Sequence, residues 1–294
     1  MSKVFKQQMR GESLDDFSQR LVSTTESERR RMAKQVKRFV RYLHERPFQS
    51  PYSVKEVIKS GSLGKGTAVR DLADIDLVVF VNGLTSIDDL KEEREDLLED
   101  LEDHLRTTAK ISPEKSSKYS LTYDWHDIKV DILPAVDVLS LYGSPRKVYD
   151  VMGQFKPRRE AAQQFSASLA PLQRDFVKEI PEYVKKVIRL VKLWKEENSL
   201  EIRSYSIELL TIFVWTSNGE ENPGTDNLFR KVMRKLATCE TLQVGFDDNY
   251  KCSAYPSMSP PYIRDPANPY MNTLERINSL DEVSDCARRV LQRL

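Results

Sequence analysis

The sequence predicts an α+β protein with two lobes: a mixed β-sheet lobe over residues 1–155 and a C-terminal helical lobe over residues 156–294. Two observations predict this division. Short runs rich in β-branched residues, which are typical of strands, occur at 54–60 and 75–81, and residues 119–123 and 127–133 predict two further strands. After residue 150 the apolar residues follow a helical period instead, over 159–169, 171–179, 181–198, 204–218, 225–239 and 274–293.

The remaining segments of the first lobe also have recognisable patterns. Residues 12–45 predict a helix, because apolar residues such as Met32, Val36 and Phe39 recur at helical spacing, and we expect it to span both lobes. Residues 86–109 predict a charged amphipathic helix, and "DWHD" favours a hairpin between the last two strands. In the second lobe, the proline-rich segment 256–270 predicts an ordered loop or a lid.

The composition excludes several classes of protein. The chain has 294 residues, 39% of them hydrophobic and 31% charged, and no apolar run long enough to cross a bilayer, so we expect no membrane partner. Three cysteines and three histidines are scattered along the chain, which predicts neither a disulfide framework nor a zinc site. No signal peptide is recognisable, and a reducing setting is expected, the cytoplasm first and the nucleus as the alternative.

The motif "GSLGKGT" superficially resembles a phosphate-binding P-loop. That motif requires a glycine, four residues and then Gly-Lys-Ser or Gly-Lys-Thr, whereas Lys65 is followed by Gly66. The motif leads into a strand that carries Asp74 and Asp76. We therefore reject a P-loop, and expect Gly61 and Ser62 to offer N–H and hydroxyl donors to phosphate oxygens beside the mobile charge of Lys65.

Three aspartates in apolar strands predict a metal site. Asp74 and Asp76 are two residues apart, so their side chains point to the same side of a strand. Asp131 is a lone acid in a second strand, and strand pairing would bring it beside them. Three carboxylates suit two Mg²⁺ ions about 4 Å apart, with Mn²⁺ as the alternative, that activate a hydroxyl and stabilise a leaving pyrophosphate. Alternatives are an exposed strand end for the first pair and Asp127 as a rival to Asp131.

These residues carry a family resemblance. "GSLGKGT", "DIDLVVF" and "VDILPAVD" resemble polymerase-β-type nucleotidyltransferases, and more narrowly 2′-5′-oligoadenylate synthases and cyclic GMP-AMP synthase. Three later segments, 172–194, 204–215 and 260–269, resemble oligoadenylate synthase segments in the same order. The resemblance implies a nucleotidyltransferase lobe followed by a helical lobe, and a role in innate immunity. It implies a catalytic and metal-binding triad of Asp74, Asp76 and Asp131.

The resemblance also implies contacts to the donor nucleotide. Ser62, Arg189 and Lys192 would face its triphosphate, with Lys65 on the active-site loop, and Tyr205 would stack on its base. Ser204 stands where oligoadenylate synthases usually have Gln, and resembles cyclic GMP-AMP synthase instead. The zinc ribbon of the latter is missing. The resemblance thus favours a linear 2′-5′-oligoadenylate made from ATP, with a cyclic dinucleotide made with a second NTP as the alternative. A catalytically inactive RNA-binding relative and a poly(A) polymerase or transfer-RNA nucleotidyltransferase are weaker alternatives.

A basic surface predicts a double-stranded RNA activator. Residues 29–41 contain seven basic residues and no acid, whereas the net charge of the chain is only +1. Because proteins read double-stranded RNA mostly through its backbone and shape, such a rigid basic strip is suitable. The candidate RNA-binding residues are Arg30, Lys34, Lys37, Arg38, Arg41, Lys59, Arg174 and Lys178. The last three match RNA-contacting positions of oligoadenylate synthases in the resemblance. The competing interpretation is a solvated helix face.

Overall fold

A computed structural model describes residues 3–219, 221–275, 277 and 279–294. The described chain forms two compact units, and each is described by itself. The sheet unit contains Thr24–Asp175, and the helical unit contains the described residues up to Ser23 together with Phe176–Leu294. Residues 156–175 therefore lie in the sheet unit. The mixed sheet in the first part and the helices of the second confirm the predicted α+β class.

Five strands form the sheet of the sheet unit. Their order is β1-β2-β5-β4-β3, with β2 and β5 parallel and every other neighbouring pair antiparallel. Four of them were predicted, and the short β3 was not. The strands are β1 (Ser53–Lys59), β2 (Asp74–Asn82), β3 (Lys115–Ser116), β4 (Leu121–Asp124) and β5 (Lys129–Ala135). The helices of this unit are α2 (Glu26–Leu43), α3 (Gly61–Lys65), α4 (Ile87–Thr108), α5 (Val138–Tyr142), α6 (Pro145–Gln154) and α7 (Arg158–Gln164), and α8 (Ala170–Lys178) begins in it.

The central strands β2 and β5 are buried on both faces. Side chains alternate along a strand, so Val78 and Phe80 share one face with Asp74 and Asp76, while Leu77 and Val79 take the other. Val78 and Phe80 pack with Ile58 of β1, Ala135 of β5 and Ala170 of α8 in one apolar cluster. This core fixes the two strands in the middle of the sheet, where their polar residues are held in defined positions.

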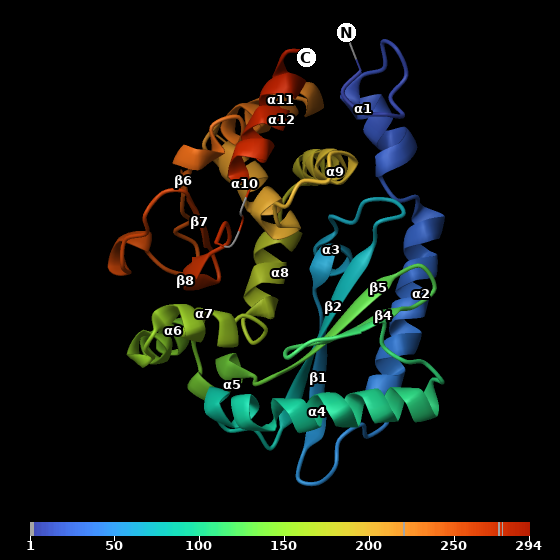
Figure 1. Cartoon of the computed structure of the whole chain (residues 1–294), viewed down its shortest axis with the longest axis vertical. Coiled ribbons are helices and arrows are strands. Elements are labelled where there is room, and N and C mark those ends of the chain that lie inside the picture. Colours follow the sequence, from blue (N-terminus) through green and yellow to red (C-terminus); the bar gives the residue numbers. More distant parts are fainter. Residues whose placement is uncertain (1–2, 220, 276, 278) are drawn as a thin grey trace. The chain divides into compact units, whose positions relative to one another are not determined.

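Helix α2 runs along the sheet and α4 crosses it (Figure 1). Phe39 of α2 contacts Tyr123 and Trp125 edge to face, and the Trp125 indole donates to the Gln35 carbonyl. The helix predicted over 12–45 is interrupted. The structure has α1 (Leu14–Phe17), a π-helical turn η1 (Ser18–Val22) and then α2. A capping box between Thr25 and Glu28 begins the new helix, a signal that the apolar period does not carry.

The helical unit is built around α9 (Glu182–Glu197). Helix α10 (Ser204–Thr216), α11 (Thr225–Leu236) and η1 pack against α9, and α12 (Leu280–Leu291) packs against α11 (Figure 1). The predicted proline-rich loop holds two strands, β7 (Tyr262–Asp265) and β8 (Asn268–Asn272), which form a small sheet with β6 (Gln243–Val244). The 3₁₀ turns η2 (Cys239–Thr241) and η3 (Cys252–Ala254) complete the unit. Within the described ranges, every helix is too short or too polar to cross a membrane.

Candidate active site

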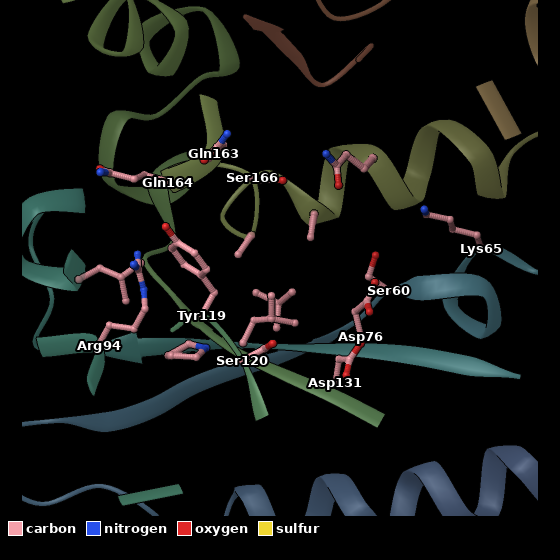
Figure 2. Close-up of a pocket in the computed structure, with 17 residues that line it drawn as sticks. Ser60, Lys65, Asp76, Arg94, Tyr119, Ser120, Asp131, Gln163, Gln164 and Ser166 are labelled. Atoms are coloured by element: carbon pink, nitrogen blue, oxygen red, sulfur yellow. The ribbon is translucent and has the colours of Figure 1, made fainter. Parts of the chain in front are cut away.

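Asp76 and Asp131 face each other on neighbouring strands. In the parallel register of β2 and β5 these two residues are direct partners, as expected if the strand of Asp131 pairs beside that of Asp76. Both line a cavity of about 240 Å³ in the sheet unit. Figure 2 shows them side by side, with Ser60 and Lys65 nearby. The structure thus brings together two of the three predicted aspartates at one open space.

Helix α3 replaces the predicted glycine-rich loop. Its five residues, Gly61–Lys65, pack on β2, and two glycines are required by this close approach. Gly61 has a φ of +67°, and a Cβ there would lie 2.8 Å from the Asp76 backbone nitrogen. A Cβ on Gly64 would lie 2.6 Å from the Lys59 carbonyl oxygen. The helix ends with Lys65, which is 7% exposed and lines the cavity.

Asp74 is held differently from the other two aspartates. The Ser62 hydroxyl donates a short hydrogen bond to Asp74 Oδ1, and the Ser62 N–H donates to Oδ2 at 3.3 Å. Asp74 and Ser62 are therefore bonded to each other, and neither lines the cavity. The Asp131 carboxylate accepts a hydrogen bond from the Thr122 hydroxyl on β4, with 2.5 Å between Oγ1 and Oδ1. Asp131 keeps its place at the cavity through this contact.

The carboxylate oxygens at the cavity are suitable ligands for magnesium, although the three predicted aspartates are not arranged around one point. Within the described residues, no group of three or more His, Cys, Asp or Glu side chains is arranged to hold a metal. Mg²⁺ is commonly bound by one or two carboxylates, with substrate phosphates and water completing its shell. Asp76 and Asp131 provide two carboxylates with hard oxygen atoms beside one cavity, so these residues fit the ion.

Sequence reasoning missed Arg94, Tyr119 and Gln164, which also line the cavity. Arg94 is 5% exposed and lies on α4 at an apolar position, four residues after Leu90 and three before Leu97, both buried. Its guanidinium lies over the Tyr119 ring, 4.9 Å from the centroid. A basic residue at a core-facing position of an amphipathic helix is the signal that could have identified Arg94.

The other predicted nucleotide-binding residues lie in the helical unit, most of them in polar contacts. Lys192 on α9 is 6% exposed and donates to Glu208 of α10, at 2.5 Å. Arg189 is buried too, and pairs with Glu182. The half-buried Tyr205 donates to Asp265 Oδ1 at 3.1 Å, and burial together with this carboxylate raises the pKa of the Tyr205 hydroxyl well above its ordinary value. Ser204 begins α10.

The predicted RNA-binding residues are mostly exposed. On α2, Lys34, Lys37 and Arg41 are exposed, Arg30 pairs with Glu26 at 2.8 Å, and Arg38 lies over the Trp125 ring. Lys59 is exposed at the end of β1, directly before Ser60 of the cavity. Arg174 and Lys178 lie one turn apart on α8, where Arg174 is half-buried beside Asp175. The structure therefore presents the basic face of α2 to solvent.

Two family models match the chain. The model described as "Second Messenger Oligonucleotide or Dinucleotide Synthetase domain" matches residues 10–147. The model described as "2'-5'-oligoadenylate synthetase 1, domain 2, C-terminus" matches residues 143–293. The first covers the strands that carry the aspartates, and the second covers the helical unit beyond residue 175.

Individual proteins are similar over most of the chain. The 2′-5′-oligoadenylate synthase 1A of Rattus norvegicus is 31% identical, over 79% of this chain and 75% of the relative. The cyclic AMP-AMP-AMP synthase of Escherichia coli (strain MS 115-1) is also 31% identical, over 84% of this chain and 77% of the relative.

Solved structures are also similar to this chain. The complex of CdnC from E. coli MS115-1 with HORMA-deltaN has a TM-score of 0.66 at 25% identity, and covers 94% of this chain and 87% of that chain. The structure of CdnC with ATP has a TM-score of 0.65 at 24% identity, covers 94% of this chain and 88% of that chain, and shows the likeness of fold alone. The chain belongs to the family of nucleotidyltransferases that contains the 2′-5′-oligoadenylate synthases and the cyclic GMP-AMP synthase-like enzymes.

Proposed function

We propose that this nucleotidyltransferase polymerises ATP into 2′-5′-linked oligoadenylate, releases pyrophosphate, and is activated by double-stranded RNA. One observation supports the chemistry above all others. Asp76 and Asp131 are partners across two parallel strands, and both open onto one cavity with the buried Lys65. Such an arrangement suits a reaction at a phosphorus atom. The carboxylates would hold the metal counter-ions, and the lysine would hold the negative charge of the phosphates.

The reaction assigns a separate task to each group. The 2′-hydroxyl oxygen of one nucleotide bonds to the α-phosphorus of ATP, its proton passes to water, and the bond to the β-phosphate breaks. When bound, Mg²⁺ would lower the pKa of the attacking hydroxyl and neutralise the pyrophosphate. We assign its coordination to Asp74, Asp76 and Asp131. Lys65 would stabilise the charge that develops on the leaving phosphates.

Further donor contacts are proposed from the family resemblance. Gly61 and Ser62 of α3 would lie next to the triphosphate. From the helical unit, Arg189 and Lys192 would contact its phosphates, and Ser204 and Tyr205 would contact the base. Because the Lys192 ammonium and Tyr205 hydroxyl are held by Glu208 and Asp265, we expect their side chains to be oriented before ATP binds. This preorganisation would lower the entropy cost of binding.

The cyclic product is the second candidate. Ser204 supports it, as does the similarity to a relative named cyclic AMP-AMP-AMP synthase, which equals the rat oligoadenylate synthase in identity. In that case a final transfer would join the two ends of one short oligonucleotide. The same aspartates would serve, so the two candidates differ in the placement of the acceptor and not in the chemistry at phosphorus.

Activation by RNA is supported by the exposed charges of α2 and by the position of Lys59. Lys59 is adjacent in sequence to Ser60, which lines the cavity. We propose that RNA contacts the basic face formed by Lys34, Lys37 and Arg41, together with Lys59, Arg174 and Lys178. Movement at Lys59 would be transmitted to α3 and from there to Ser62 and Asp74, so that the Asp74 carboxylate joins the other two.

A product assay tests this proposal. Purified protein is incubated with Mg²⁺ and ATP, or ATP with GTP, with and without a long double-stranded RNA, and the products are identified by mass spectrometry and by digestion with linkage-specific nucleases. We expect linear 2′-5′-adenylates that appear only with RNA. Cyclic products would refute the linear linkage, and equal rates without RNA would refute activation.

A pair of variants locates the RNA surface in the same assay. Lys34→Ala combined with Lys37→Ala should weaken RNA binding, because each phosphate contact contributes to a salt-dependent affinity. The RNA concentration that gives half-maximal activity should therefore rise about tenfold. The matched control is Arg146→Ala with Lys147→Ala, which removes two exposed charges from α6 of the same unit. Equal effects of both double variants would refute α2 as the RNA surface.

A further inference from the structure

The cavity extends from the aspartates to a second polar end on α4, α7 and the turn before β4. Figure 2 shows Asp76 and Asp131 between Lys65 on one side and Arg94 with Tyr119 on the other. The family resemblance assigned no residue at this end. Its three polar groups, Arg94, Tyr119 and Gln164, come from separate segments of the sheet unit and line the same space as the aspartates.

Arg94 is a buried cation with no carboxylate counter-charge among the described residues. It is 5% exposed, and among the described residues it has no carboxylate partner and no hydrogen bond, only the Tyr119 ring at 4.9 Å. Burial lowers the pKa of the Arg94 guanidinium, although the Tyr119 hydroxyl opposes this shift. A buried charge without a partner is costly, and a cation–π contact offsets only part of the cost. An anion in the cavity would supply the missing partner.

Gln164 adds a hydrogen-bond acceptor to the same end. Its Nε2 donates to Glu160 Oε1 at 2.9 Å, and since a carboxylate only accepts, this contact fixes the orientation of the amide. Gln164 Oε1 is consequently an acceptor, and it is buried without a partner within the described chain. A ligand that satisfies both groups must carry an anion for Arg94 and an N–H or O–H donor for Gln164. A nucleotide has both.

The order of groups along the cavity distinguishes the acceptor nucleotide from the donor. In phosphoryl transfer the attacking and leaving oxygens lie on opposite sides of the phosphorus. The carboxylates that would flank that phosphorus lie between Lys65 and Arg94 (Figure 2). If Lys65 receives the leaving pyrophosphate, the attacking hydroxyl must come from the side of Arg94.

We propose that Arg94, Tyr119 and Gln164 form the subsite for the acceptor nucleotide, in which Arg94 binds a phosphate group and Gln164 Oε1 accepts from a hydroxyl or amine. This inference rests on the proposed nucleotidyl transfer and extends it to a specificity-determining residue. The guanidinium makes the site selective for acceptors that carry a 5′-phosphate, which suits a growing oligonucleotide that retains the phosphates of its first nucleotide.

Acceptor kinetics test the subsite. ATP is the donor, and the acceptor is a 2′-5′-linked adenylate dimer with or without a 5′-triphosphate. Arg94→Gln should raise the KM of the phosphorylated dimer by about tenfold or more, as for a lost charged hydrogen bond, and leave the KM of the unphosphorylated dimer unchanged. Arg94→Lys should restore part of the affinity, because it keeps the charge but not the bidentate geometry. Arg106→Gln, on the exposed side of α4, is the matched control.

A binding measurement separates this inference from the proposed function. Inorganic tripolyphosphate is titrated into the full chain without metal, and heat of binding is recorded for the wild type, Arg94→Gln, Arg94→Lys and Arg106→Gln. If Arg94→Gln is the only variant that binds tripolyphosphate more weakly, the subsite is supported even when no transfer is detected. The absence of transfer would refute only the proposed function. Transfer with the same KM for both dimers in every variant would overturn the subsite and leave the proposed function intact. Thermal melting verifies folding, and Arg94→Lys serves as the test if Arg94→Gln does not fold.

Discussion

At the scale of single residues, two glycines determine how closely α3 approaches the strand of the aspartates. Gly61 combines a positive φ with contact to the β2 backbone, whereas Gly143, at the end of α5, has a φ of +79° and open space where a Cβ would lie. Both positions disfavour a side chain because of their backbone conformation, but only a side chain at position 61 would also collide with a neighbouring strand. Comparing alanine variants at the two positions therefore isolates the energetic cost of this collision.

Replacing these glycines by alanine should have different costs. Gly143→Ala is expected to lower the free energy of unfolding by about 1 kcal/mol, the penalty of the left-handed conformation. Gly61→Ala should lower it by about 2 kcal/mol more, because a methyl group at 2.8 Å from the Asp76 nitrogen must displace α3. Urea unfolding measures both. Equal losses in the two variants would show that α3 accommodates the methyl group without strain.

The residues of the site were predictable to different degrees. Asp76 and Asp131 could be predicted because a carboxylate in an apolar strand is costly, and the parallel register then made them partners. The bond between Ser62 and Asp74 could not, since it depends on α3 forming a helix where the glycines suggested a loop. The core-facing position of Arg94 can be recognised in the sequence, but the cavity that it lines cannot, because this cavity is assembled from segments far apart in the chain.

At the scale of elements, a buried ion pair joins α9 to α10. Lys192 and Glu208 are 6% and 1% exposed and 2.5 Å apart. Periodicity places Lys192 on the polar face of α9, and the sequence does not show that α10 offers an acid to it. Helices α9 and α10 were themselves predicted within a few residues, whereas α5, α6 and the strands β6–β8 were not, since these elements are short and depend on tertiary contacts.

Breaking this pair should destabilise the helical unit. Lys192→Met is expected to lower the free energy of unfolding by about 3 kcal/mol, because the Glu208 carboxylate stays buried without this cation. The double variant Lys192→Met with Glu208→Gln should recover most of the loss. Lys251→Met, which removes an exposed pair with Asp247, should cost less than about 1 kcal/mol and is the control. Thermal melting of the four proteins measures the effects, and a loss no larger than that of Lys251→Met would contradict a structural role for the pair.

At the scale of the whole molecule, the collinear resemblance and the two family matches give the same assignment. The segments at 172–194, 204–215 and 260–269 lie within the range 143–293 matched by the oligoadenylate synthetase C-terminal model. The class of reaction follows from the family, whereas the linkage, the activator and the acceptor subsite are proposals. The central claim is therefore that the cavity between β2, β5 and α4 is where transfer takes place.

Pyrophosphate release from ATP by the Asp131→Asn variant tests this claim most directly. The matched control is Asp127→Asn, an acid at the turn before β5, four residues away in sequence. The amide keeps the size of Asp131 but removes the charge that would hold a metal, so we expect a loss of about a thousandfold or more in Asp131→Asn and little change in Asp127→Asn. Retention of wild-type pyrophosphate release by a folded Asp131→Asn protein would contradict the account.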